Sequence, residues 1–498
     1  MAKLIKIPEG EIVSRLYDIT VDGETAQAYE ARVSAMPYNT PWPGRERPLD
    51  QTELAAFISL ESAGAVEFTV KPRKAFSSAV VRPLSKGVRP VIEEKSVRFT
   101  LPGPGQYVFE AEDFHGALHI FVNPPAEYDL SGDVLYYGAG VHEVGDVFLR
   151  SGQTVYVDEG AVVYGAFIAN DCENVRVLGR GVIDGSHEIR TSNTLLLPYS
   201  YTGPIEKGQA GYDRKFENRR VLSGVLRFFD CRNVTVEGVT LRDSSSFTVI
   251  PARCDGVVIE NIKTIGMYRY NSDGIDLFNS VNVTVKNSFL RNYDDCMVIK
   301  GICGWDDWNN ENITVTGCVV WCDWGRALEL GAETNAPEYK HILFEDCDVI
   351  HGCDLCMDVQ HHNRAKVSDV TFRNIRCEYN RAQLNQQLQE HQWDEYDASR
   401  PGSHPFLMGV YVLHDFIFCP VDKYESGTAR DITFEDVEIY ADEGLPMPTS
   451  NFIAYSEENN IEGVKIRNVR MNGKPVEELS ELKINMSDFV GGVSYTKE

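Results

Sequence analysis

The chain has 498 residues, of which 43% are hydrophobic and 24% are charged, so it is long enough for more than one globular domain. Its formal net charge of −26, without a long basic stretch, argues against nucleic acid as a partner. No run of about 18 apolar residues is present, so we expect no membrane-spanning helix.

The N-terminal segment and the cysteines indicate a reducing compartment. Residues 1–9 lack the apolar centre of a signal peptide, which predicts a cytoplasmic protein, with a secreted protein whose leader has been removed as the alternative. The 12 cysteines are scattered, and Cys353 and Cys356 form a CxxC pair without the second pair that a zinc ribbon needs. We therefore expect free, buried thiols and no metal site. No phosphate-binding loop is present either, so no cofactor is expected.

Residues 1–125 have the pattern of a separate all-β unit. Apolar residues alternate or nearly alternate in several short segments, which are separated by turn residues at the spacing of a sandwich: 57–60, 65–70, 97–101 and 106–110. A further strand at 118–122 is followed by Pro124 and Pro125, which mark its exit. The sequence predicts an N-terminal β-sandwich domain over residues 1–125.

A repeat begins after this unit. In each copy Asn, Asp, Gly or His precedes alternating apolar residues, at 174–177, 233–236, 256–259, 282–285, 312–315, 341–344, 369–372, 431–434 and 463–466. Between 233 and 369 the spacing is 23 to 30 residues, which is too short for a βαβ unit and suits one coil of a parallel β-helix. Asn tolerates the left-handed conformation of a coil corner. A leucine-rich horseshoe lacks its required leucines here, so we predict an all-β protein with a β-helix over residues 126–498.

Three segments are too long for coil turns: 185–220, 301–311 and 380–430. Such excursions form loops on one rim of a solenoid, where binding groups are common. Trp305 and Trp393 lie in these segments, and their flat rings are suitable platforms for sugar faces. Packing of these rings against the helix wall is the alternative.

Two acidic clusters lie about one coil apart. Asp273 belongs to the stretch Asn271-Ser272-Asp273-Gly274, and Asp294 and Asp295 follow 21 residues later. Equivalent positions on neighbouring coils are about 4.8 Å apart, so these carboxylates are expected to meet. Strict alternation would send Asp294 and Asp295 to opposite faces, so the strand is expected to end or bend there.

Crowded carboxylates cannot all ionise, which raises one pKa and places a proton donor beside a base. Glycoside hydrolysis needs this pair. A polar ladder or a calcium site on the helix surface is the alternative explanation.

These stretches resemble the Asn-Thr-Asp-Gly and Asp-Asp-Cys motifs of glycoside hydrolase family 28, the polygalacturonases. Residues 179–185, Gly-Arg-Gly-Val-Ile-Asp-Gly, resemble that family's Gly-x-Gly-x-Ile-Asp-Gly stretch. The resemblance covers roughly residues 135–375. It implies a right-handed parallel β-helix and hydrolysis with inversion, with Asp294 as general acid and Asp273 and Asp295 holding and activating water. The preceding sandwich is similar to that of family 49 dextranase and isopullulanase, which cut α-glucans.

The sequence also departs from family 28. Arg326 stands where the family has the histidine of Gly-His-Gly, and the later Arg-Ile-Lys that grips a uronate is not visible; the nearest stretch, 357–362, contains Asp358 and His361. Losing two cations and gaining an acid argues against a galacturonate in that subsite and favours a neutral sugar or a differently held acidic one. The substrate-binding candidates are therefore Asn271, Arg326, Glu329, Glu333, Asp358, His361, Trp305 and Trp393.

We expect an inverting hydrolase of plant-type or related oligo- or polysaccharides. An α-glucan hydrolase, a β-helical fructosyl transferase or lyase, and a non-enzymatic glycan-binding β-helix are the alternatives. The sugar, the linkage, endo or exo action and a homo-oligomeric state are left open.

Overall fold

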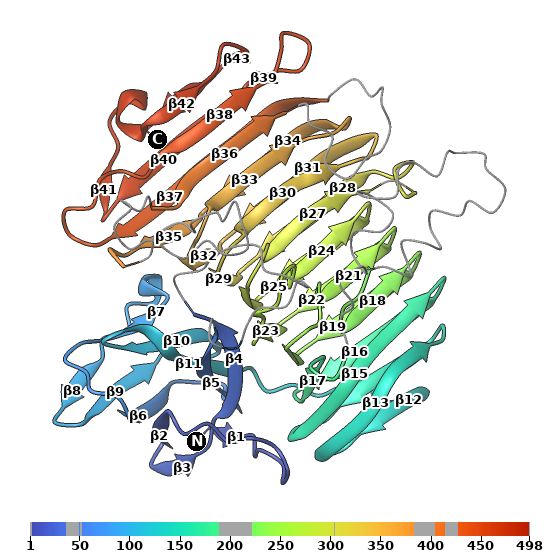
Figure 1. The fold of residues 1–498 in the computed structure, drawn as a ribbon, viewed down its shortest axis with the longest axis vertical. Helices are drawn as coiled ribbons and strands as arrows, with labels where there is room; N and C mark the ends of the chain where they lie inside the picture. The colour runs from blue at the N-terminus through green and yellow to red at the C-terminus, as the bar shows by residue number, and fades with distance from the viewer. Residues whose placement is uncertain are drawn as a thin grey trace.

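A computed structural model describes residues 2–35, 49, 52–188, 222–302, 304–382, 404–413 and 427–497. Its N-terminal part consists of two sheets packed face to face (Figure 1). One sheet contains β1 (Lys3–Leu4), β4 (Tyr29–Ser34), β5 (Thr52–Glu61), β7 (Ala79–Arg82), β10 (Gly105–Ala111) and β11 (Asp113–Asn123). The other contains β2 (Tyr17–Val21), β3 (Glu24–Ala26), β6 (Val66–Pro72), β8 (Val91–Glu93) and β9 (Ser96–Leu101). Alternating residues such as Val66, Phe68 and Val70 fill the space between the sheets, which confirms the predicted sandwich.

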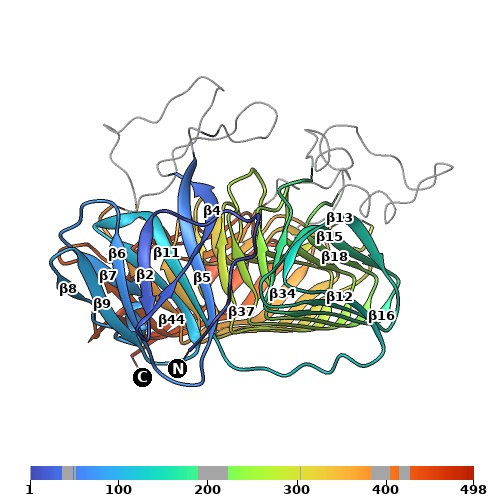
Figure 2. The ribbon, with the colours of Figure 1, turned by 90° about the horizontal axis from the view of Figure 1, so that it is seen from below.

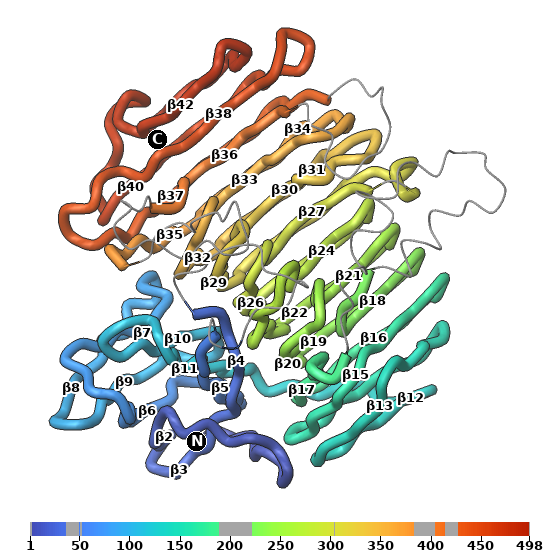
Figure 3. The backbone as a smooth tube through the Cα atoms, in the orientation of Figure 1, coloured from blue at the N-terminus to red at the C-terminus, as the bar shows by residue number. Residues whose placement is uncertain are grey.

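The remaining strands form a right-handed parallel β-helix, as predicted (Figures 1 and 3). It begins with β12 (Asp133–Tyr137), β13 (Gly140–Leu149), β14 (Gln153–Val157) and β15 (Ala161–Asn170). From β15 onward most strands pair with the strand three places later, so each coil adds one strand to each of three parallel sheets. The sandwich strands end at Asn123 and the helix strands begin at Asp133; the domain division at 125 stays a prediction.

The first of the three sheets contains β18 (Leu226–Phe229), β21 (Val249–Ala252), β24 (Ile275–Phe278), β27 (Met297–Gly301), β30 (Arg326–Thr334), β33 (Leu355–His361), β36 (Phe406–Val412) and β38 (Ser450–Ala454). The second contains β16 (Glu173–Gly179), β19 (Arg232–Glu237), β22 (Asp255–Glu260), β25 (Val281–Lys286), β28 (Asn310–Thr316), β31 (Glu338–Glu345), β34 (Lys366–Arg373) and β37 (Thr428–Ala441).

The third contains β17 (Val182–Asp184), β20 (Thr240–Arg242), β23 (Lys263–Ile265), β26 (Phe289–Asn292), β29 (Val319–Cys322), β32 (Asp348–His351) and β35 (Arg376–Tyr379). The C-terminal coils use β39 (Ile461–Glu462), β40 (Lys465–Met471), β41 (Lys474–Pro475), β42 (Ile484–Met486), β43 (Val490–Gly491) and β44 (Ser494–Thr496). The described residues also include the short 3-10 helices Leu84–Lys86 and Leu479–Leu482.

The first residue of each repeat is a coil corner. Asn233, Asn282 and Asn312 have positive φ angles of 52°, 58° and 55°, the left-handed conformation that Asn tolerates. Their side chains also form a ladder: Asn312 Nδ2 donates to Asn282 Oδ1 at 3.1 Å, one coil earlier. The repeat seen in the sequence is therefore the coil period.

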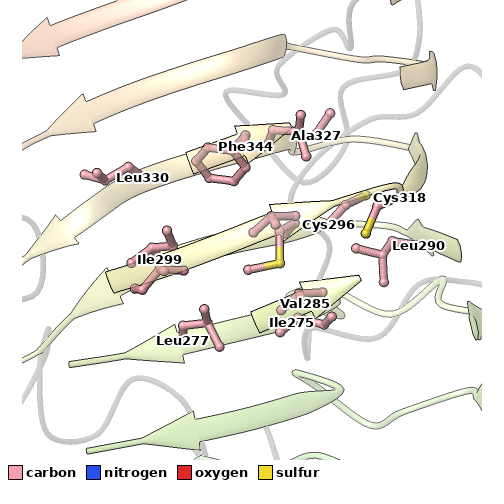
Figure 4. Packing of buried hydrophobic residues seen from close by; sticks show 14 of the residues in the cluster. Ile275, Leu277, Val285, Leu290, Cys296, Ile299, Cys318, Ala327, Leu330 and Phe344 are labelled. Atoms are coloured by element: carbon pink, nitrogen blue, oxygen red, sulfur yellow. The ribbon is translucent and has the colours of Figure 1, made fainter. Parts of the chain in front are cut away.

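The helix interior is filled by the inward residues of each strand. Figure 4 shows Leu277, Ile299 and Leu330 side by side on β24, β27 and β30, with Cys296 among them. The ten cysteines that the structure describes are free and buried, as predicted; Cys303 and Cys419 lie outside the described residues.

Stacked phenylalanines provide a test of this core. The ring centroids of Phe344 and Phe372 are 4.7 Å apart, and those of Phe372 and Phe434 are 5.2 Å apart. Phe372→Ala should lower the free energy of unfolding by about 3–5 kcal/mol, because it leaves a cavity between two rings. Chemical denaturation measures this, with the 40% exposed Phe489 changed to Ala as the control. Equal denaturation midpoints for Phe372→Ala and wild type would contradict the packing account.

In the described residues the sandwich packs against the side of the helix (Figure 2), and their buried apolar contacts involve mainly the third sheet. Phe57 and Phe121 of the sandwich pack with Phe289 and Trp321 of the helix in one buried cluster. Polar contacts also cross this junction, including the buried ion pair of Arg82 of the sandwich with Glu378 of β35. Among the described residues, this cluster contains no residue of the first sheet.

Candidate active site

The predicted aspartates lie at the start of two neighbouring strands of the first sheet. Asp273 precedes β24, and Asp294 and Asp295 lie in the bend between β26 and β27, so the strand ends there as expected. Because β24 pairs with β27, the two clusters meet on adjacent coils.

Backbone hydrogen bonds hold these two coils together at the aspartates. The Gly274 N–H donates to the Asp295 carbonyl at 2.8 Å, and the Ile275 N–H donates to the Cys296 carbonyl at 3.0 Å. A Cβ added at Gly274 would lie 2.1 Å from the Cys296 carbonyl oxygen, so only glycine fits at this position without a clash. This close approach explains the glycine in Asn271-Ser272-Asp273-Gly274.

Asp294 and Asp295 converge on Gly325, which lies one coil further on. The position that a Cβ would take at Gly325 is 2.6 Å from Oδ1 of both carboxylates. The Arg326 N–H also donates to Asp295 Oδ1 at 3.2 Å. The two side chains therefore point to one place, although strict alternation would have separated them.

Gly325→Ala should damage this arrangement without changing any charged group. The added methyl would force both carboxylates apart, and small displacements of reacting groups cost about 10²-fold in rate. We expect about that loss in kcat, measured with whatever glycan the wild type hydrolyses. Gly64→Ala, which meets nothing within 4 Å, is the control. A rate for Gly325→Ala equal to wild type would show that the convergence is not needed.

Lys300, which sequence reasoning missed, lies at the centre of the acidic cluster. Its Nζ is 2.8 Å from Asp273 Oδ2, 3.3 Å from Asp276 Oδ1 and 3.3 Å from Asp295 Oδ2. The side chain is 6% exposed, so little water screens these interactions. The alternation of side chains along β27 could have identified Lys300 from the sequence. Met297 and Ile299 point into the core, so Lys300 lies on the opposite face, which carries the aspartates.

The surroundings of the three predicted aspartates shift their pKa values differently. Burial, together with the charges of Asp273 and Asp295, raises the pKa of Asp294 well above its usual value. Burial also opposes ionisation of Asp295, but Lys300 and Arg326 outweigh it and lower the pKa of that group. Burial raises the pKa of Asp273 to about 6 despite the attraction of Lys300. A proton donor thus stands beside a carboxylate that is ionised at neutral pH.

A second acidic group follows on the next two coils. Glu329 of β30 pairs in register with Asp358 of β33, and both side chains are 0% exposed. Arg326 Nε is 4.0 Å from Glu329 Oε1 and 3.6 Å from Asp358 Oδ2, and Arg326 Nη2 is 3.1 Å from Asp354 Oδ2. The structure therefore brings Arg326, Glu329 and Asp358 together, as candidate residues for one subsite.

The other candidates occupy varied positions. Asn271 Nδ2 donates to Asp294 Oδ2 at 3.4 Å, and Glu333 Oε2 is 3.9 Å from Lys300 Nζ. The buried His361 bonds to the Thr334 hydroxyl through Nδ1 at 2.6 Å, and burial lowers its pKa to about 3. These three side chains thus contact the site or the strands that build it.

The prediction for Trp305 as a sugar platform is wrong. Trp305 is 0% exposed and stacks on Phe229 with ring centroids 5.9 Å apart, because its apolar ring is taken into a buried cluster. Trp393 lies outside the described residues.

Metal and membrane features give no further candidates in the described parts of the chain. There, no group of three or more His, Cys, Asp or Glu side chains is arranged to hold a metal ion. No helix in those parts has the length and hydrophobicity to cross a bilayer.

Comparison with known proteins agrees with the motifs. Residues 146–384 match the family model described as Glycosyl hydrolases family 28. A polygalacturonase of Penicillium janthinellum is 29% identical over 121 residues, which is 24% of this chain and 30% of that protein. A probable rhamnogalacturonase A of Aspergillus oryzae (strain ATCC 42149 / RIB 40) is 32% identical over 139 residues, 26% of this chain and 28% of that one. The chain thus spans under a third of the length of these relatives.

Similarity at the level of fold covers the whole chain. The solved structure of Dex49A from Penicillium minioluteum superposes with a TM-score of 0.62 at 12% identity, covering 99% of this chain and 96% of that one. At this identity the likeness concerns the fold, sandwich and helix together. Together these comparisons confirm the resemblance to glycosyl hydrolases family 28 over residues 146–384.

Proposed function

We propose that the chain is a glycoside hydrolase that cleaves pectic-type or related glycans with inversion. The observation that carries the proposal is the pair of Asp294, whose pKa is raised well above its usual value, and Asp295, whose pKa is lowered. One group is protonated and its neighbour ionised at the same pH. Glycosidic bond cleavage by two carboxyl groups requires this difference.

Each aspartate has one role in this reaction. Asp294 protonates the glycosidic oxygen as the bond to the leaving sugar breaks. Asp295 and Asp273 accept hydrogen bonds from a water and take its proton as it attacks the anomeric carbon. Lys300 contacts both of these carboxylates and keeps them ionised. Asn271 orients Asp294 through its hydrogen bond to Oδ2.

The glycan class is supported by the relatives. The names of the two relatives compared above, a polygalacturonase and a probable rhamnogalacturonase, each refer to a pectic substrate. Retention of Asp273, Asp294 and Asp295 at one place favours catalysis over a glycan-binding role, because a binding surface has no need of a carboxyl held protonated beside an ionised one.

Release of reducing sugar is the direct test. Wild type and Asp294→Asn are incubated with polygalacturonate, rhamnogalacturonan, dextran and pullulan, together with carboxyl-reduced forms of the two acidic polymers. Release by wild type that the variant loses supports the proposal. A product that absorbs near 235 nm would identify a lyase, and a cyclic disaccharide a transferase. No release from any glycan would overturn the proposed activity.

The anomer of the first product tests inversion. Asp294 Oδ1 and Asp295 Oδ1 each lie 2.6 Å from one point, so they are closer than the roughly 6.5–9.5 Å separation common in inverting pairs. The attacking water is therefore placed by Asp273 and Asp295 on one side of the sugar, not between Asp294 and Asp295. NMR of the first product should show the inverted anomer; a retained anomer would require a covalent intermediate.

A further inference from the structure

A column of polar residues continues from the catalytic aspartates along the first sheet. Glu329 pairs in register with Asp358, Asp358 with Gly409, and Gly409 with Asn451, each one coil further toward the C-terminus. The residues on either side of each acid, such as Leu328, Leu330, Met357 and Val359, point into the core. Alternation therefore places Glu329 and Asp358 on the same face as the catalytic groups.

The described part of the chain offers few hydrogen-bond partners to the carboxyl groups of this column. Apart from the contact of Glu329 with Asp295, the oxygens of Glu329 and Asp358 are buried without a hydrogen bond to a described residue, and Arg326 Nε also makes none there. Buried polar atoms in native proteins are nearly always paired, so such a cluster indicates groups that are satisfied by something else. Hydroxyl groups of a sugar both donate and accept, and they match carboxyl and guanidinium groups together.

The charge of the column does not suit an acidic sugar. Arg326 already faces the carboxyl groups of Asp354, Asp358 and Glu329 at 3.1, 3.6 and 4.0 Å. A uronate placed there would be removed from water with only this one guanidinium, already shared by three carboxyl groups, to offset its charge, and a buried charge without a partner of its own is costly. A neutral sugar adds no charge.

We propose that Glu329, Asp358 and Arg326 form a subsite that binds a neutral sugar unit of the substrate through its hydroxyls and excludes a uronate at that position. The inference rests on the proposed glycoside hydrolase function and narrows its substrate to glycans with an uncharged sugar next to the cleaved bond. Gly409 leaves room for Asp358, because a Cβ there would lie 2.6 Å from Asp358 Oδ1.

The protonation of these acids agrees with this role. Burial raises the pKa of Asp358 to about 8 despite the neighbouring Arg326. Burial, together with the charge of Asp295, raises the pKa of Glu329 well above its usual value. Both shifts favour the protonated form, in which a carboxyl group offers one donor and one acceptor to a hydroxyl pair.

Matched substrates test the subsite. Polygalacturonate and rhamnogalacturonan each differ from their own carboxyl-reduced form in the carboxyl groups alone, and dextran and pullulan add neutral glucans. We expect kcat/KM for a neutral or carboxyl-reduced glycan to exceed that for every fully acidic one by at least about tenfold. A tenfold ratio corresponds to about 1.4 kcal/mol of binding free energy. Equal or faster hydrolysis of polygalacturonate would overturn this inference and leave the hydrolase proposal intact. No hydrolysis of any glycan would overturn both.

Variants at Asp358 test the residue itself. Asp358→Asn keeps a donor and an acceptor, so its KM for the preferred neutral glycan should rise less than that of a leucine variant. Asp358→Leu removes both, and KM should rise about tenfold with kcat changed much less. An unchanged KM for Asp358→Leu, with both variants folded by circular dichroism, would show that the side chain does not contact the substrate.

Discussion

Asp294→Asn is expected to lower kcat on a natural glycan by about 10³-fold, within the 10²–10⁴ range of general acid catalysis. The amide is nearly isosteric with the protonated carboxyl group, and it can still face Gly325 and Asn271. It has no proton to give to the leaving oxygen. KM should therefore change little, since the shape and the neutral charge at that position are kept.

An activated leaving group distinguishes the acid from the base. An aryl glycoside with an acidic phenol leaves without protonation, so Asp294→Asn should lose much less activity on it than on a natural glycan. Asp295→Asn should lose similar activity on both, because water still has to be deprotonated. Equal losses for Asp294→Asn on the two substrate types would contradict the assignment of Asp294 as the acid.

A matched control is available for the Asp294 substitution. Asp348 is a buried aspartate of β32 that pairs with Arg376 at 2.7 and 2.9 Å. Asp348→Asn should lower the denaturation midpoint, because a bidentate ion pair is weakened, and it should leave kcat of the folded protein unchanged. Loss of activity in that control would indicate that any buried Asp→Asn change disturbs the coils.

The coil architecture could be predicted because its causes are local. The corner Asn or Asp and the alternating apolar residues recur in each coil, so the sequence alone determines the period and the inward face. The left-handed φ angles at Asn233, Asn282 and Asn312 show that these repeated positions are the coil corners. The meeting of Asp273 with Asp294 followed from the same period, since one coil separates them.

The parts of the site that could not be predicted depend on contacts between coils. Lys300 has no motif of its own, and its role comes from three carboxylates that two neighbouring coils bring to it. The bend that turns Asp294 and Asp295 toward Gly325 likewise needs the neighbouring coil. The prediction for Trp305 was wrong because an aromatic residue in a long insertion can either bind a ligand or pack in the core. The sequence does not distinguish these two positions, and in the structure the ring packs on Phe229.

Lys300→Met is expected to move the acidic limb of the rate profile to higher pH and to lower kcat at pH 6 by about 10²-fold. In the wild type the rate should fall below about pH 6, where Asp273 becomes protonated. Removing the ammonium group destabilises the ionised forms of Asp273 and Asp295, so both pKa values rise. A rise of one unit corresponds to about 1.4 kcal/mol.

The direction of this shift separates an electrostatic role from a structural one. Lys300→Arg keeps the charge and should retain the wild-type limb, although the larger guanidinium lowers kcat. Lys263 is another buried lysine, held by Asn123 and backbone carbonyls at the sandwich junction, and Lys263→Met should lower stability without moving the limb. If the limb of Lys300→Met stays near pH 6, the ion pairs of Lys300 do not set the ionisation of Asp273. If it moves as expected, the lysine keeps two of three crowded carboxylates ionised while the third stays protonated, which is the condition that hydrolysis by Asp294 requires.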